Sequence, residues 1–252
     1  MNYVGARAAF FERREHDFWW LTLHAVEKYL KAALLMNGQT ANEPNHNLMT
    51  LTARLRKLDS RLVLPAFTRP ALAGAEKMFD FHNADFVKWL NIYGSAPNRY
   101  ATYSYVISDL DLFRADHLIY WARRHVRLLR QTLPDGQVID WVKELAESPS
   151  LWRDHSGAPL ERLADQPGHS SAKRSFVRAN VAFFPNKRHR PVNRGGGFTN
   201  GGIFNVIQNL KNSVPGSPDR EEMRQVLTWV LEHIFLPKVE VAEIRKIMDD
   251  HP

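Results

Sequence analysis

Four polar side chains recur at helical spacing within HAVEKYLKAALLMNG, residues 24–38. His24, Glu27, Lys28 and Lys31 occupy positions i, i+3, i+4 and i+7, so a helix would align them in one stripe beside an apolar face. Glu27 and Lys31 form an i,i+4 pair in the favourable order, which contributes about 0.3–0.5 kcal/mol. We interpret the stripe either as a solvated helix face with helpful pairing or as a basic groove for phosphate or for a partner helix.

A second concentration of cations lies between Gln166 and Pro218, a window that contains no Asp or Glu. Its eight basic residues exceed the net charge of +7, so the basicity of the chain is local. The most closely spaced ones fall in a Gly/Asn-rich loop with aromatic neighbours: Lys187, Arg188, Arg190 and Arg194, beside Phe183, Phe184 and Phe198. Such a loop suits single-stranded RNA or DNA, because cations track phosphates and rings stack on bases. A surface loop that happens to be basic is the alternative.

Helical periodicity dominates the elements that must position these residues. Apolar spacing and turn residues predict helices over about 8–36, 47–57, 71–92, 105–131 and 137–147, with no strand-like alternation before residue 148. Residues 149–202 are rich in Pro, Gly, Ser and Asn, and two helices are expected to follow, one starting at Ser217-Pro218 and one over 239–248. We therefore expect an all-α fold: a helical bundle over 1–147, and a basic, loop-rich region over 148–252 that ends in two helices.

The chain resembles a known family at the same stripe. His24 to Leu34 reads HAVEKYLKAAL, Gly38 follows, and His46-Asn47-Leu48 begins the next helix with Leu51 and Leu55. Over residues 5–131 this order is similar to the HEPN domain, whose first long helix has an A-x-E-K-x-x-K-A-x-L signature followed by H-D-L-x-x-L. Arg99-Tyr100 also resembles a recurrent HEPN feature. The resemblance implies an up-down bundle of four to five helices, usually dimeric. It further implies binding of RNA or nucleotide in a prokaryotic stress, defence or toxin–antitoxin setting.

Many HEPN proteins are metal-independent ribonucleases with an R-x4–6-H motif, in which Arg and His from two protomers meet. Here Arg114 and His117 are too close in sequence for that motif, whereas Arg245 and His251 fit its spacing but lie outside the recognised domain. Arg162 and His169 also fit, with Pro-Gly between them. We expect binding without turnover. The alternatives are an endoribonuclease with a variant site, whose candidates are Arg114, His117, Arg245 and His251, and a protein-interaction module that serves a protein encoded nearby.

The residues expected to contact RNA or nucleotide are two helix lysines, an arginine–tyrosine pair and the basic loop: Lys28, Lys31, Arg99, Tyr100, Lys187, Arg188, Arg190 and Arg194. An arginine beside an aromatic can grip phosphate and stack on a base. For His117 a buried, hydrogen-bonded core position is expected, and for His46 a capping or structural role.

Several classes of function find no signal in the sequence. With no cysteine, the chain has no disulfide, no thiolate metal site and no thiol nucleophile. We find no spacing typical of metal ligands and no phosphate-binding glycine loop, so no metal or cofactor is predicted. The N-terminus does not read as a signal peptide, and no apolar run is long enough to cross a bilayer. A cytoplasmic protein without a membrane partner is expected.

Overall fold

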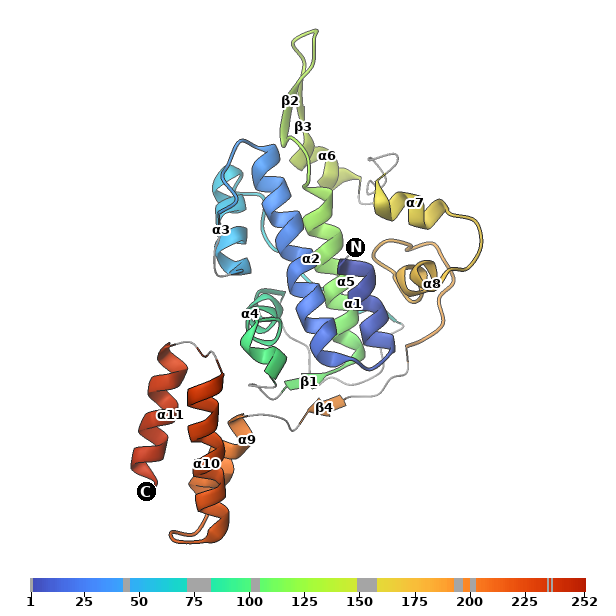
Figure 1. Ribbon diagram of the computed structural model, residues 1–252. Helices are drawn as coiled ribbons and strands as arrows, with labels where there is room; N and C mark the ends of the chain where they lie inside the picture. Colours follow the sequence, from blue (N-terminus) through green and yellow to red (C-terminus); the bar gives the residue numbers. More distant parts are fainter. Residues whose placement is uncertain are drawn as a thin grey trace. The chain divides into compact units, whose positions relative to one another are not determined.

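The computed structural model describes residues 2–42, 46–71, 83–100, 105–148, 158–192, 197–199, 203–234, 236 and 238–252. Helices make up most of this part of the chain, with two pairs of very short strands between them (Figure 1). The expected all-α class is confirmed at this level. No helix within the described ranges is both long enough and apolar enough to cross a membrane.

The chain forms two compact units, which we call unit 1 and unit 2. Unit 1 comprises residues 1–94 and 108–196, and unit 2 comprises residues 95–107 and 197–252. This division differs from the one expected at residues 147/148. The segment 158–192 packs with the first helices, and the segment 95–107 joins the C-terminal part.

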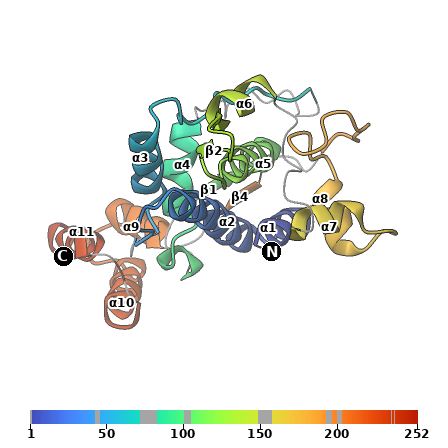
Figure 2. The same cartoon turned by 90° about the horizontal axis from the view of Figure 1, so that it is seen from above.

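Three helices form the centre of unit 1: α1 (Asn2–Phe11), α2 (Glu15–Met36) and α5 (Asp109–Arg124). Figures 1 and 2 show α2 and α5 side by side, and α1 packs against both. One helix was expected over 8–36. The chain instead breaks between α1 and α2, where Arg13 adopts a left-handed backbone with φ of 59°. Helix α2 ends as expected at Asn37-Gly38, and Gly38 has φ of 71°.

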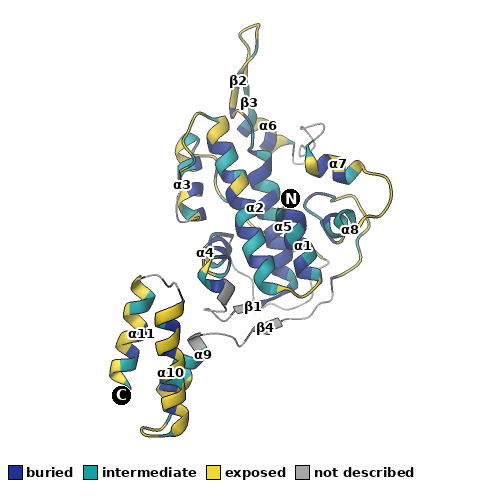
Figure 3. Cartoon of the chain, viewed as in Figure 1, coloured by how far each residue is buried: buried dark blue, intermediate teal, exposed yellow. Residues whose placement is uncertain are grey.

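Two further helices, α3 (Leu48–Leu58) and α4 (Asn83–Tyr93), pack against α2. Asn47 caps α3, because its side-chain oxygen accepts hydrogen bonds from the backbone N–H groups of Met49 and Thr50. The helix expected over 71–92 is described only from Asn83, and its earlier residues lie outside the described ranges. The buried sides of these helices meet in one core, which appears dark blue in Figure 3.

The expectation of a purely helical segment up to residue 147 is wrong. The helix predicted over 105–131 is shorter at both ends, and a hairpin follows it, formed by β2 (Arg130–Thr132) and β3 (Val138–Asp140). Its turn contains Gly136 with φ of 85°, a conformation that favours glycine. The turn residues Asp135-Gly136 were recognised in the sequence, but three-residue strands are too short to show alternation. Helix α6 (Trp141–Glu147) then completes this segment.

Two short helices from the loop-rich region, α7 (Pro159–Asp165) and α8 (Ser171–Val177), complete unit 1. Helix α8 packs on α1, and Phe176 and Phe183 are buried beside Tyr3. A buried ion pair joins Arg7 of α1 to Asp116 of α5, and Tyr3 donates a hydrogen bond of 2.7 Å to the same carboxylate. This part of the predicted extension therefore belongs to the first core.

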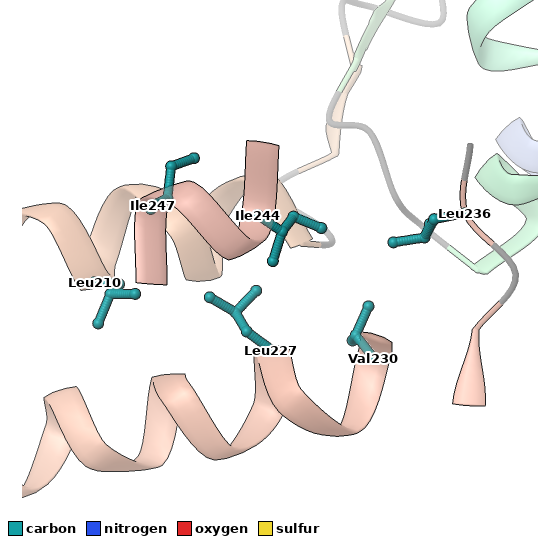
Figure 4. Packing of buried hydrophobic residues seen from close by; sticks show 6 residues of the cluster. All are labelled: Leu210, Leu227, Val230, Leu236, Ile244 and Ile247. Atoms are coloured by element: carbon teal, nitrogen blue, oxygen red, sulfur yellow. The ribbon is translucent and has the colours of Figure 1, made fainter. Parts of the chain in front are cut away.

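Unit 2 contains the antiparallel pair β1 (Tyr105–Ile107) and β4 (Gly197–Thr199), and a short 3-10 helix, η2 (Pro97–Tyr100). Three helices follow: α9 (Ile203–Asn212), α10 (Pro218–His233) and α11 (Lys238–Asp250). Two were expected, and α9 was missed. Their shared core consists of Leu210, Leu227, Val230, Leu236, Ile244 and Ile247 (Figure 4). The Ser217 cap and Pro218 start of α10 are confirmed, with Ser217 Oγ accepting a hydrogen bond from the Arg220 N–H.

Candidate functional site

The polar stripe of α2 divides into two parts in the structure. Glu27 is buried, with 4% of its surface exposed, and Lys31 Nζ lies 2.6 Å from its Oε1 atom. His24 Nδ1 lies 3.2 Å from Glu27 Oε2. Lys28, by contrast, is exposed and donates a hydrogen bond of 3.4 Å to Asn2 Oδ1. Three residues of the stripe, His24, Glu27 and Lys31, thus form an internal cluster around the Glu27 carboxylate, and the fourth, Lys28, is available to a ligand.

His46 completes the internal cluster from a separate segment. Its Nδ1 lies 2.9 Å from both carboxylate oxygens of Glu27, and its ring centroid is 5.1 Å from that of His24. The His46 backbone is left-handed, with φ of 54°, a conformation that costs a side-chain-bearing residue about 1 kcal/mol or more. Asn47, rather than His46, caps α3. The structural role expected for His46 is therefore a side-chain contact with Glu27.

The environment of the cluster shifts two pKa values. Burial alone would raise the pKa of Glu27, but hydrogen bonds from Lys31, His46 and His24 outweigh it and lower that pKa. Burial lowers the pKa of His24, although Glu27 partly opposes this effect. Glu27 is consequently held as a carboxylate inside a ring of nitrogen donors.

The three side chains His24, Glu27 and His46 could together hold a metal ion, since one donor atom from each lies within 4.8 Å of the others. We expected no metal constellation from the sequence. The spacing 24, 27, 46 matches no ligand motif, because the third residue comes from another segment. Only the packing of the residues before α3 against α2 brings the donors together.

Lys28 lies on a pocket of about 320 Å³ whose walls are mostly apolar. Helices α1, α2, α5 and α7 all contribute to it, and its lining includes Tyr3, Tyr29, Arg123 and Leu160. This volume is at the small end of the range for small-molecule sites. Burial raises the pKa of Tyr29, so its phenol stays protonated and can donate a hydrogen bond. The sequence had pointed to Lys28 but not to the pocket.

Arg123 lies at the same pocket. On the helix expected over 105–131, the spacing of Arg123, Arg127 and Arg130 predicts a solvated outward face for all three. That expectation is wrong for two of them. Arg123 and Arg127 are buried, and Arg123 is ion-paired with the buried Glu161. Arg130 is exposed and belongs to β2. The helical stripe does not continue to Arg130, because α5 ends at Arg124.

The basic loop remains solvent-facing where the structure describes it. Lys187, Arg188 and Arg190 are exposed, and Arg194 lies outside the described residues. Two of the three aromatic neighbours can be compared with the expectation, since the side chain of Phe198 lies outside the described part of the structure. Phe183 is buried in the core of unit 1, and Phe184 contacts Phe176, with 5.2 Å between ring centroids. Phe183 is therefore a structural anchor for this loop and cannot stack on a base without leaving the core.

Asn98, Arg99 and Tyr100 belong to the short 3-10 helix η2 in unit 2. Asn98 is buried. The side chains of Arg99 and Tyr100 lie outside the described part of the structure, so their expected phosphate and base contacts stay predictions.

The catalytic candidates are distributed over both units. Arg114 is fully buried on α5, with its guanidinium 5.1 Å from the Phe67 ring, so it is out of reach of an RNA strand in this conformation. His117 is half-buried, Asn83 Nδ2 lies 3.5 Å from its Nδ1, and burial lowers its pKa. Arg245 is exposed on α11, and His251 follows the end of that helix. Arg162 and His169 are both exposed, Arg162 on α7 and His169 beyond its end.

No protein-family model, curated protein or solved structure matches the chain. The assignment of a function therefore rests on the geometry and chemistry of these residues.

Proposed function

We propose that the chain is a HEPN-type helical protein that binds RNA or a nucleotide through unit 1. The observation that carries the proposal is the pocket beside Lys28. Its apolar and aromatic walls suit a nucleobase, and the exposed Lys28 ammonium group suits the attached phosphate. Binding without turnover is proposed, because the buried Arg114 would have to leave the core before it could contact a scissile phosphate.

Two features support the HEPN part of the proposal. Glu27 and His46 are both signature residues of the resemblance, they come from separate segments, and their side chains are in contact. The helices that carry the signature, α2 and α3, also pack directly on each other. A contact between the two signature segments supports the proposal, because a shared signature would require them to lie together.

The exposed cations Lys187, Arg188 and Arg190 supply the second part of the proposed surface. They lie in a long window without carboxylates, and their loop is fixed to unit 1 through the buried Phe183. Cations without neighbouring acids attract the phosphate backbone irrespective of sequence. We propose that this loop contacts phosphates along a strand while the pocket accepts one base. A free nucleotide would then compete with RNA for the pocket alone.

Lys28 provides the sharpest test. In buffer with EDTA, fluorescence anisotropy of a labelled single-stranded RNA is measured against the full chain at several salt concentrations. Lys28→Ala is expected to weaken binding and to reduce the slope of log affinity against log salt by about 0.7, the value for one phosphate contact on a single strand. Lys88→Ala is the matched control, because Lys88 is an exposed helix lysine whose ion pair among the described residues is with Asp85. Equal affinities for wild type and Lys28→Ala would contradict the proposal.

A denaturing gel of the same samples shows whether the protein only binds the RNA or also cleaves it. Intact RNA is expected throughout. Fragments that disappear in an Arg245→Ala or His117→Ala variant would instead establish the endoribonuclease alternative.

A further inference from the structure

The cluster around Glu27 consists of side chains that bind transition metals. His24 and His46 offer imidazole nitrogens, and Glu27 offers a carboxylate oxygen from a buried position. Two histidines and one glutamate are a donor set typical of Zn²⁺ and of other divalent first-row metals. The cluster is separate from the pocket, which these three residues do not line.

The spacing of the donor atoms fits one small ion. Zinc lies 2.0–2.2 Å from nitrogen and carboxylate ligands, so neighbouring donors in a tetrahedral shell are about 3.3 Å apart. In the structure Glu27 Oε2 lies 3.2 Å from His24 Nδ1 and 2.9 Å from His46 Nδ1. The third separation, between a nitrogen of His24 and one of His46, is within 4.8 Å, so one ion could contact all three side chains after small adjustments.

His24 presents its Nδ1 atom to the Glu27 carboxylate, 3.2 Å from Oε2. Its other nitrogen, Nε2, is buried and has no hydrogen-bond partner among the described residues. In the neutral tautomer with its proton on Nε2, the Nδ1 lone pair faces Glu27 Oε2.

We propose that His24, Glu27 and His46 bind one divalent transition-metal ion of the zinc class. Glu27 coordinates through Oε2 while Lys31 keeps its contact with Oε1. His46 is half exposed, so the ion enters along its ring and retains a coordination position that faces solvent. The ion ties the residues before α3 to α2. This proposal does not depend on RNA binding, which is tested in EDTA.

A substitution of Lys31 distinguishes the proposed metal site from the main alternative, in which the cluster holds no metal and is only a network of ion pairs. The Lys31 ammonium group lies 2.6 Å from the carboxylate and repels a metal ion that shares it. Removal of this charge by Lys31→Met is therefore expected to tighten metal binding several-fold. In a metal-free cluster the same change removes only an ion pair and creates no metal affinity.

The experiment is isothermal titration calorimetry of Zn²⁺ into the full chain after treatment with EDTA and removal of the chelator. Wild type is expected to bind one ion per chain, and His46→Ala to bind it at least about tenfold more weakly, since even outer residues of metal sites change affinity 10–100-fold. His233→Ala is the matched control, because His233 is an exposed histidine of unit 2 and should leave the affinity unchanged.

Circular dichroism of each variant checks that the helices are retained. No binding by wild type, or equal affinities for wild type and His46→Ala, would overturn the proposal. If His46→Ala loses its helices, the Lys31→Met variant tests the proposal in its place. Tighter binding of one zinc ion by this variant would support the site, and unchanged or weaker binding would overturn the proposal.

Discussion

The charged residues of this chain differ in burial. Exposed ones can bind a ligand, whereas buried ones stabilise the fold. Lys28 and Lys31 are one helical turn apart on α2, yet Lys31 is paired with a buried carboxylate while Lys28 is exposed at a pocket. Arg114 and Arg123 are likewise buried within α5. A charge removed from water must be compensated by partners, so these buried cations are structural elements of the core.

His125 gives a prediction about pH at the scale of single residues. Burial, reinforced by the charges of Arg124 and Arg127, lowers the pKa of His125 to about 4. An unfolded histidine titrates near 6.5, so between these values the unfolded chain binds a proton that the folded chain does not. The contribution of His125 to the free energy of unfolding therefore rises with pH across this window. That contribution is lost as pH falls from about 6.5 to about 4. The full difference amounts to about 3 kcal/mol.

Urea unfolding of wild type and His125→Gln between pH 4 and pH 7 measures this contribution. The variant lacks the titrating group, so the stability difference between the two proteins should shrink as pH falls. Parallel stability curves would contradict the assignment.

At the scale of elements, Gly94 determines how closely the end of α4 approaches α2. A Cβ atom there would lie 2.6 Å from Leu23 Cβ, 2.7 Å from the Trp19 carbonyl oxygen and 2.8 Å from the Leu90 carbonyl oxygen. Backbone atoms cannot turn aside as a side chain can. Gly94→Ala is therefore expected to lower the free energy of unfolding by about 1–3 kcal/mol, the usual cost of overpacking.

Gly5→Ala is the matched control for this substitution. Its added Cβ would meet only Leu21 Cδ1, the end of a flexible side chain, at 3.3 Å. Alanine also favours a helix interior over glycine by up to about 1 kcal/mol. Chemical unfolding should show little loss, or a gain, for Gly5→Ala, and equal losses in both variants would refute the packing argument.

At the scale of the whole molecule, the two units have separate hydrophobic cores. A substitution in one core should therefore lower the stability of that unit and leave the stability of the other unchanged. Leu227 is fully buried in the core of α9, α10 and α11 (Figure 4). Leu227→Ala should cost about 2–5 kcal/mol. Because local stability follows local packing, hydrogen exchange should accelerate in α9–α11 and stay unchanged in α2 and α5.

Val226→Ala is the control for this experiment. Val226 is the neighbouring residue on α10 and is 41% exposed, so its truncation should change exchange little. Faster exchange in α2 as well as in α10 after Leu227→Ala would mean that the two units unfold as one.

The sequence by itself determined the helical class, the ends of several helices and the position of the basic loop. These features depend on neighbouring residues: apolar periodicity, the Asn37-Gly38 stop and the Ser217-Pro218 start act within one or two turns of chain. The sequence also marked His24, Glu27 and Lys28 as a set. It could not show that Lys28 faces a pocket while Glu27 faces His46.

Only the tertiary structure decided which distant segments meet. Asp116 pairs with Arg7, Glu161 pairs with Arg123, and Glu27 contacts His46, and no local pattern records any of these pairs. The burial of Phe183 was missed for the same reason, because it depends on an apolar surface supplied by α1 and α8. The hairpin after α5 was missed because strands of three residues are too short to show alternation. The pocket and the metal-donor cluster arise where such segments pack, because side chains converge there from helices that the sequence keeps apart.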